Sequence, residues 1–395
     1  MAKIAILERK CTGCGLCANS CPFGAIDMKD GHPELNAACK VCGVCVKACP
    51  EKAILRLETK TSSVDKSLWH DILVFAEVSG GRLHPVSLEL IGKGLELAKN
   101  VNYQVKAVLV GSGVSAYAEE LRHYGVSEVA VYDDPELAYF RADAYAACVE
   151  DYIKYAKPSV VLVGATSLGR SLAPRLSTRF HTGLTADCTK LEMRENTDLV
   201  QIRPAFGGNI MAQIITTNTR PQFATVRYKV MNAPARREEA SGTVLPRKLP
   251  KRVAECKAAC VSVTPVPPKK SISDAEVLVV GGRGLQKEAD LEMVKELAGL
   301  LGGDWATTRP LVEKGWNTND RQIGLSGRTV RPRLIITCGV SGAIQFTACM
   351  KASDHIIAIN TDRNAPIFDV AHVAIVGDLY EIVPALIKQL KEARA

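Results

Sequence analysis

Residues 11–22 read Cys-Thr-Gly-Cys-Gly-Leu-Cys-Ala-Asn-Ser-Cys-Pro, and residues 39–50 read Cys-Lys-Val-Cys-Gly-Val-Cys-Val-Lys-Ala-Cys-Pro. Both segments have the spacing C-x2-C-x2-C-x3-C-P. Cysteine thiolates are soft ligands that suit iron, and four of them close a [4Fe–4S] cluster. Because the fourth cysteine of such a run normally binds the other cluster, the spacing predicts two ligand sets. These sets are Cys11, Cys14, Cys17 and Cys49 for one cluster, and Cys21, Cys39, Cys42 and Cys45 for the other.

A single C-x2-C pair is also compatible with a zinc site or a redox-active dithiol. Two complete runs, each closed by a proline, favour iron–sulfur clusters over zinc or disulfides. The segment resembles a bacterial two-cluster ferredoxin domain over roughly residues 3–58, in which residues 3–7 and 53–57 are expected to pair as short strands. Such clusters carry one electron each and usually have low potentials, so we expect the remaining chain to exchange single electrons with them.

Composition limits the class of protein. The chain has 395 residues, of which 47% are hydrophobic and 23% are charged, as in soluble globular proteins with two or three domains. The net charge of +8 suits an acidic redox partner, and without an aromatic-interleaved basic stripe we expect no nucleic-acid binding. Because no apolar run reaches the length of a membrane span and no signal peptide is recognisable, we expect no membrane span and a cytoplasmic location.

Strand-like and helix-like segments alternate after a polar linker at residues 59–68. Strands are expected at 72–77, 105–110, 128–132 and 159–164, and helices at 87–99, 115–124 and 135–156. This alternation predicts a parallel sheet with crossover helices. Residues 189–230 change to short strand-like segments with a turn at 203–209, and the prolines and basic residues of 233–272 predict a solvated linker.

A last unit begins with an apolar run at 276–280 and the turn Gly281-Gly-Arg-Gly284, followed by a helix to about residue 301 and a loop containing Arg309. Strands are expected at 334–337, 355–360 and 373–376, and helices after the glycine turn at 339–345 and over 380–392. Two glycine turns after apolar strands favour nucleotide binding. The fold is therefore predicted to be α/β: a ferredoxin-like domain at 1–60, then Rossmann-like parallel-sheet domains at 69–232 and 273–395.

Several motifs within residues 69–395 resemble those of the α subunit of electron transfer flavoproteins. They are Gly80-Gly-Arg-Leu-His-Pro-Val86, Gly183-Leu-Thr-Ala-Asp-Cys188, Arg203-Pro-Ala-Phe-Gly-Gly-Asn-Ile-Met211, Asn218-Thr-Arg-Pro221, Gly281-Gly-Arg-Gly284, Ser341-Gly-Ala-Ile-Gln345 and Ala365-Pro-Ile-Phe368. The resemblance implies that FAD binds mainly to the C-terminal domain and that a smaller β subunit completes a heterodimer.

The resemblance also implies which residues bind FAD. Arg283 is expected to contact the flavin, Thr308 and Arg309 to lie near its ring, and the turn 341–345 to hold the pyrophosphate. Ser326 takes the place of a threonine that hydrogen-bonds flavin N5, and its hydroxyl is retained. The complete expected set is Arg283, Thr308, Arg309, Ile323, Gly324, Leu325, Ser326, Ser341, Gly342, Ala343, Ile344, Gln345, Phe346, Asn360, Asp378 and Leu379, the last three lining the adenosine end.

Two of these positions have alternative interpretations. Arg309 is expected to favour an anionic flavin, but a surface ion pair would also explain an arginine there. Many family members have a histidine near flavin O2 where this chain has Phe346. A hydrogen-bond donor is lost at that position, so the resemblance does not extend to how the reduced flavin is stabilised.

Simple members of the family lack an iron–sulfur domain. Its fusion to the α subunit resembles the electron-bifurcating caffeyl-CoA reductase complexes, in which NADH oxidation is coupled to reduction of ferredoxin and an enoyl-CoA through an acyl-CoA dehydrogenase-like partner. A lactate-type dehydrogenase is an alternative partner. A plain electron carrier between a dehydrogenase and ferredoxin, without bifurcation, is the rival function, and purely structural clusters are a third interpretation.

Overall fold

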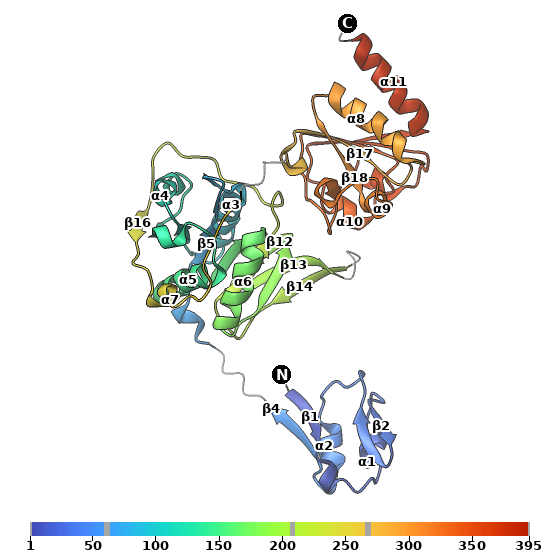
Figure 1. Cartoon of the computed structure of the whole chain (residues 1–395). Coiled ribbons are helices and arrows are strands. Elements are labelled where there is room, and N and C mark those ends of the chain that lie inside the picture. Colours follow the sequence, from blue (N-terminus) through green and yellow to red (C-terminus); the bar gives the residue numbers. More distant parts are fainter. Residues whose placement is uncertain (1, 59–63, 206–209, 265–269, 394–395) are drawn as a thin grey trace. The chain divides into compact units, whose positions relative to one another are not determined.

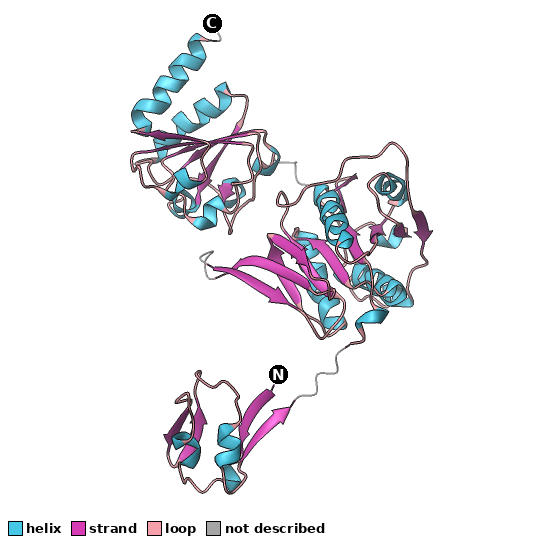
Figure 2. Cartoon of the chain, turned by 180° about the vertical axis from the view of Figure 1, so that it is seen from behind, coloured by secondary structure: helices cyan, strands magenta, loops and turns pink. Residues whose placement is uncertain are grey.

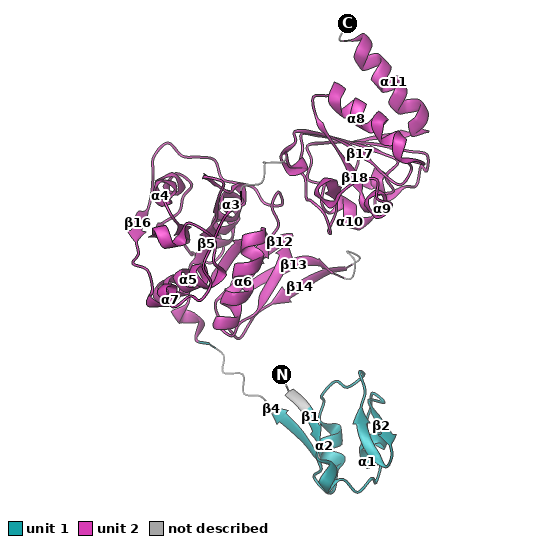
Figure 3. Cartoon of the chain, in the orientation of Figure 1, with its two compact units in different colours: residues 1–64 teal, residues 65–395 magenta. Residues whose placement is uncertain are grey.

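The computed structural model describes residues 2–58, 64–205, 210–264 and 270–393. The chain forms two compact units, Met1–Val64 and Asp65–Ala395 (Figure 3). The linker expected at 59–68 lies partly outside the described residues, and its described end contains the short helical turn Lys66–Leu68. None of the helices in the described part of the chain has the length and apolar character needed to cross a lipid bilayer.

The first unit is built from short elements. They are β1 (Ala2–Ile6), α1 (Leu16–Asn19), β2 (Ile26–Lys29), β3 (His32–Leu35), α2 (Val44–Ala48) and β4 (Ile54–Glu58). Strands β1 and β4 pair antiparallel, which confirms the expected pairing, and β2 and β3 form a hairpin. The cluster of buried apolar side chains in this unit contains Cys17, Ile26, Cys45 and Ile54, so two of the predicted iron ligands are also core residues of the unit.

A seven-stranded parallel sheet organises the first half of the second unit. Its order is β11-β15-β10-β5-β8-β9-β16. The strands are β5 (Ile72–Ala76), β8 (Val105–Gly111), β9 (Glu128–Asp133), β10 (Val160–Gly164), β11 (Leu184–Cys188), β15 (Gln222–Val226) and β16 (Thr243–Pro246). The predicted parallel sheet and its first four strands are therefore confirmed.

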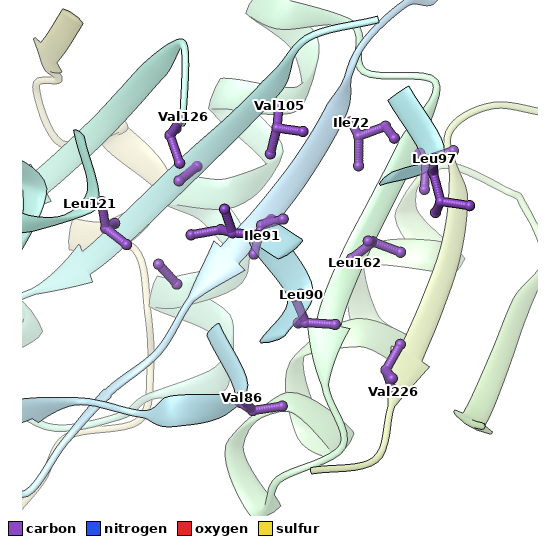
Figure 4. Close-up of a cluster of buried hydrophobic side chains, with 14 of the residues drawn as sticks. Ile72, Val86, Leu90, Ile91, Leu97, Val105, Leu121, Val126, Leu162 and Val226 are labelled. Atoms are coloured by element: carbon purple, nitrogen blue, oxygen red, sulfur yellow. The ribbon is translucent and has the colours of Figure 1, made fainter. Parts of the chain in front are cut away.

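Helices cover both faces of this sheet. They are α3 (Pro85–Lys99), α4 (Ser115–Arg122), α5 (Ala142–Ala156) and α6 (Ser167–Arg179). Side chains of α3 and α4 pack on one face, and those of α5 and α6 pack on the other. Figure 4 shows the first of these layers, in which Leu90 and Ile91 of α3 lie against Ile72, Val105 and Leu162 of the sheet. Burial of these aliphatic chains stabilises the sheet on which the later loops depend.

Two expectations for this half are corrected. The helix expected over 135–156 is split into a 3₁₀ turn at Pro135–Leu137 and α5, because the Asp134 carboxylate accepts from the N–H of Glu136 and caps a separate turn. Part of the expected linker 233–272 is folded, since β16 extends the sheet and α7 (Lys251–Ala254) buries Val253. A proline can end β16 because that strand lies at the sheet edge.

A three-stranded antiparallel sheet accounts for most of the β-like segments between 189 and 230. It contains β12 (Lys190–Met193), β13 (Leu199–Ala205) and β14 (Ile210–Ile215) in that order. Strands β13 and β14 extend away from the parallel sheet (Figure 2). The turn expected at 203–209 lies partly outside the described residues.

The C-terminal half contains a six-stranded parallel sheet of order β19-β18-β17-β20-β21-β22. The strands are β17 (Val277–Gly281), β18 (Asp304–Thr308), β19 (Gln322–Ile323), β20 (Leu334–Cys338), β21 (His355–Asn360) and β22 (Val373–Val376). Helices α8 (Leu291–Leu300) and α11 (Leu379–Glu392) lie side by side on one face (Figure 1). Strand β18 was missed in the sequence because its residues Asp-Trp-Ala-Thr-Thr are only partly apolar. The helix after the second glycine turn, α10 (Ile344–Thr347), is a single turn.

A buried carboxyl group predicts a pH dependence of stability. Glu89 of α3 is buried, and its oxygens lie 2.9 and 3.2 Å from the backbone nitrogen of Lys229. Burial raises the pKa of Glu89 to about 7, above its ordinary value of 4.5. The folded state therefore binds an extra proton between these values, and this contribution to stability is lost as the pH rises through 7.

We expect the free energy of unfolding to fall by up to about 3 kcal/mol between pH 4.5 and 7 because of this group. Glu89→Gln keeps the shape of the side chain and removes its titration. Urea unfolding at pH 5 and pH 7.5 should show a smaller difference for the variant than for the wild type. Equal differences in the two proteins would show that Glu89 does not titrate in this way.

Candidate FAD site and cysteine cavities

The loops at the carboxyl edge of the C-terminal sheet meet at a reversal of strand order. From β17 the chain proceeds to β18 and β19 on one side, and then from β20 to β21 and β22 on the other. Parallel sheets of this kind bind ligands at such a switch point, outside the carboxyl ends of the strands. Arg283 follows β17, Thr308 ends β18, Gly324 follows β19, Ser341 follows β20 and Asn360 ends β21. Residues that are distant in the sequence therefore share one edge.

Two cavities adjoin at Arg283 and Ser341 along this edge. Including the space open to solvent, the first has about 1160 Å³ of empty volume and the second about 810 Å³. The first is lined by Arg283, Thr308, Arg309, Pro310, Gln322, Ile323, Gly324, Leu325, Ser326, Val340, Ser341, Ala343, Gln345 and Phe346. The second is lined by Arg283, Gly284, Gln286, Gly339, Ser341, Asn360, Thr361, Gly377, Asp378, Leu379 and Tyr380. Together they offer room for a ligand longer than the usual small molecule.

The residues predicted from the family resemblance all line one of these cavities, except Gly342 and Ile344. Gly342 shapes the turn instead, because its φ is +88° and a Cβ there would lie 2.1 Å from the backbone nitrogen of Ile367. Ile344 is exposed. Gly284 and Gly339 permit the turns after β17 and β20 to touch, since a Cβ on Gly284 would lie 2.8 Å from the Cα of Gly339.

Gln322 was missed by sequence reasoning but positions Ser326. Its side-chain Nε2 donates to the Ser326 Oγ at 2.8 Å, and Gln322 is only 2% exposed. Because the serine oxygen accepts this bond, its own proton can be donated to a ligand in the cavity. The sequence gives no signal for this role, since an isolated glutamine at the start of a two-residue strand has no motif.

Arg309 lines the first cavity and also forms the surface ion pair that was its alternative interpretation. Its Nε lies 2.8 Å from Oε1 of Glu313 one turn later, and the arginine side chain is 67% exposed. Exposed pairs of this type contribute about 0–1 kcal/mol. The two interpretations are thus compatible, because an anionic ligand can compete for the guanidinium at little cost.

The second cavity has polar groups that are already held in place. Asn360 donates from Nδ2 to the carbonyl of Val340 at 2.8 Å, and Asp378 caps α11 by accepting from the N–H of Tyr380. The Tyr380 hydroxyl donates to Asp290 at 2.5 Å. Burial and this carboxylate raise the pKa of Tyr380, so the hydroxyl stays protonated. Tyr380 was also missed by sequence reasoning.

Arg227, which follows β15, reaches the loop that carries Ser326. Its Nη2 donates to the carbonyl of Leu325 at 2.8 Å and lies 3.4 Å from Oδ2 of Asp187. Leu325 in turn donates its N–H to the carbonyl of Gln345 at 3.0 Å. A residue of the first half of the unit thus holds one wall of the cavity in the second half.

The cysteines of the first unit gather around two smaller cavities of about 330 and 300 Å³. The first is lined by Cys11, Cys14, Cys17 and Cys49, and the second by Cys21, Cys39, Cys42 and Cys45. Each cavity thus contains one predicted ligand set, with the fourth cysteine supplied by the other run. Within the described residues, no three His, Cys, Asp or Glu side chains are grouped so that they could hold a single metal ion.

Hydrogen bonds support one cysteine of each set. The N–H of Ala25 donates to the Cys21 sulfur and the N–H of Ala53 to the Cys49 sulfur, both at 3.3 Å. Burial raises the pKa of Cys17 in the first set, as it does for the matching cysteine of the second. Because metal binding requires the thiolate, iron has to displace these protons. The donor set of each cavity fits a [4Fe–4S] cluster.

Family comparisons assign all three parts of the chain. The 4Fe-4S dicluster domain family matches residues 10–54, the electron transfer flavoprotein domain matches 72–251, and the electron transfer flavoprotein FAD-binding domain matches 271–351. The first match covers all eight cysteines of the cysteine cavities, and the last covers every lining residue of the first cavity at the switch point. The C-terminal match therefore supports FAD binding, and the N-terminal match supports iron–sulfur clusters.

Several curated proteins are similar to this chain. Subunit LctC of lactate dehydrogenase (NAD(+),ferredoxin) from Acetobacterium woodii is 51% identical over 376 residues, which are 95% of this chain and 90% of that protein. The electron transfer flavoprotein subunit alpha of Clostridium acetobutylicum is 44% identical over 84% of this chain and 99% of its own length. Protein FixB of Azorhizobium caulinodans is 42% identical over 81% of this chain and 87% of its own length. The chain therefore belongs to the α-subunit family of electron transfer flavoproteins and carries a 4Fe-4S dicluster domain.

Proposed function

We propose that this chain is the α subunit of an electron-bifurcating electron transfer flavoprotein that binds one FAD and two [4Fe–4S] clusters. The observation that carries the proposal is the presence of both kinds of redox site in one chain, as four-cysteine cavities in one unit and a switch-point cavity in the other. Bound FAD would exchange one or two electrons, and each cluster would exchange one. A β subunit completes the flavoprotein.

Different residues around the large cavity would bind different parts of FAD. Arg283 and Arg309 supply positive charge beside the flavin, and Ser326, oriented by Gln322, supplies a hydroxyl donor. Phe346 forms an apolar wall. The backbone N–H groups of 341–345 suit the pyrophosphate, as such turns after parallel strands do.

The partner reaction is proposed from the relatives. The similarity to a subunit named for lactate, NAD(+) and ferredoxin covers 95% of this chain and so includes part of the cysteine unit, which favours a lactate-type dehydrogenase as partner. A complex with an acyl-CoA dehydrogenase-like partner that reduces an enoyl-CoA such as caffeyl-CoA is the second candidate. In both, the clusters deliver electrons to ferredoxin or receive them from it.

The cluster content is the first prediction from this function. Two [4Fe–4S] clusters require about eight iron and eight sulfide ions per chain, together with one FAD. Iron, sulfide and flavin analysis of protein purified without oxygen measures all three. Half of that iron content, or zinc in its place, would contradict the proposed ligand sets.

The coupling is tested on the complex with its β subunit and dehydrogenase. We expect NADH to reduce ferredoxin only while a second acceptor is also reduced, because bifurcation sends one electron of each pair to that acceptor. Separate assays with pyruvate and with an enoyl-CoA identify the partner. Ferredoxin reduction at the same rate without either acceptor would identify the chain as a plain carrier.

Removal of residues 1–64 provides the control for this assay. That segment is a separate compact unit, and the cavities at the carboxyl edge of the C-terminal sheet are lined by residues of the second unit. The shortened protein should bind FAD and oxidise NADH with an artificial acceptor, but it should not reduce ferredoxin. Full ferredoxin reduction by this protein would place the electron exit outside the cysteine unit.

Gln322 offers a test of the flavin site alone. Gln322→Ala removes the donor that orients Ser326, and we expect FAD affinity to fall about five-fold, as for the loss of about 1 kcal/mol. Fluorescence titration of the apoprotein measures the affinity, and Gln389→Ala on the exposed face of α11 is the matched control. Equal FAD affinities of the two variants would show that Gln322 does not contribute to FAD binding.

A further inference from the structure

The two cysteine runs are halves of an internal repeat that the structure preserves around both cavities. Helices α1 and α2 begin at matching positions, each after a glycine in the left-handed region, with φ of 70° at Gly15 and 82° at Gly43. Residues 13 and 41 match in the same way, with φ of 70° and 54°. The hydrogen bonds that backbone N–H groups donate to the Cys21 and Cys49 sulfurs have equal distances. The backbone and its hydrogen bonds to these sulfurs therefore do not distinguish the two sites.

The side chains beside the cavities do distinguish them. For brevity, the cavity of Cys11, Cys14, Cys17 and Cys49 is called the first cavity of this unit, and that of Cys21, Cys39, Cys42 and Cys45 the second. Thr12 lines the first cavity where Lys40 lines the second. Glu51 lines the first, and its repeat partner Phe23 lines the second.

A third pair of matching residues also gives the second cavity the more positive surroundings. Met28 lines the first cavity, and its repeat partner is Arg56 on β4. A Nη nitrogen of Arg56 lies 3.9 Å from the position of a Cβ on Gly43, which lines the second cavity. Among the lining residues, the first cavity thus has the carboxylate of Glu51 and the second has the cation of Lys40, and Arg56 lies next to the lining residue Gly43 of the second. Lys10 precedes Cys11 in the sequence, but it does not line the first cavity.

All of these charge differences favour a higher reduction potential for a cluster in the second cavity than for one in the first. Reduction adds a negative charge, which a nearby cation stabilises and a nearby carboxylate opposes. The net charge around a cluster is one of the factors that set its potential. Because Lys40, Glu51 and Arg56 are exposed, salt screens their effect but does not reverse it.

We propose that the two clusters are unequal and that the cluster held by Cys21, Cys39, Cys42 and Cys45 has the higher reduction potential. The first electron that enters the unit reduces the cluster at this site, and the cluster beside Glu51 is reduced second. The inference rests on the proposed function only in requiring that the eight cysteines hold two clusters.

The test is a potentiometric titration of the full-length chain at constant ionic strength, followed by electron paramagnetic resonance. Iron analysis first establishes that each preparation contains both clusters. We expect two one-electron steps in the wild type. Lys40→Thr, which installs the residue of the matching position, should lower the upper step and leave the lower one. Glu51→Gln should raise the lower step and leave the upper one.

Arg56→Met provides an independent variant that should also lower the upper step. Lys29→Gln removes an exposed lysine of β2 that lines neither cavity, and it should move both steps less than Lys40→Thr does. Raising the salt concentration should bring the two wild-type steps closer together.

Two outcomes overturn the inference while leaving the cluster content intact. One is a pair of equal potentials in fully loaded wild-type protein, and the other is a shift of the lower step by Lys40→Thr. A preparation with only half of the expected iron overturns the inference and the proposed cluster content together. The iron analysis therefore separates failure of this inference from failure of the proposed function.

Discussion

The contact between the turns that follow β17 and β20 is the constraint on which the FAD site depends. A Cβ on Gly284 or Gly339 would enter the backbone of the other turn, so only glycine allows this approach. The contact fixes Arg283 and Ser341 at the point where the two cavities adjoin. The first cavity extends from this point toward β18 and β19, and the second extends toward β21.

The wall formed by residues 322–328 is held differently, by polar contacts rather than by close packing. Gln322 orients Ser326 from within the loop, and Arg227 holds the carbonyl of Leu325 from outside it. A hydrogen bond from a charged group, such as the one from Arg227, contributes about 1.5–3 kcal/mol to stability. The loop that lines the first cavity is therefore tied by Arg227 to the N-terminal parallel sheet, where Arg227 also contacts Asp187.

Sequence reasoning succeeded where short-range chemistry is decisive. The cysteine spacing predicted which four thiols share each cavity, and apolar runs predicted the strands at 72–77 and 334–337. It failed where a role is created by tertiary contact. Gln322, Tyr380 and Arg227 have no motif, because each acts on a neighbour that the fold alone brings close. The strand at 304–308 and the folded part of 233–272 were missed because polar and proline residues obscure an apolar pattern that packing completes.

The cysteine unit is best understood as an addition to a complete flavoprotein subunit. The alpha subunit from Clostridium acetobutylicum matches over 99% of its length while covering 84% of this chain. The cavities at the switch point are lined by residues 283–380 of the second unit. The small core of the first unit is itself made partly of cysteines. Electron transfer by the clusters explains this arrangement more fully than a purely structural role does, because the flavoprotein part already has its own extensive apolar cores.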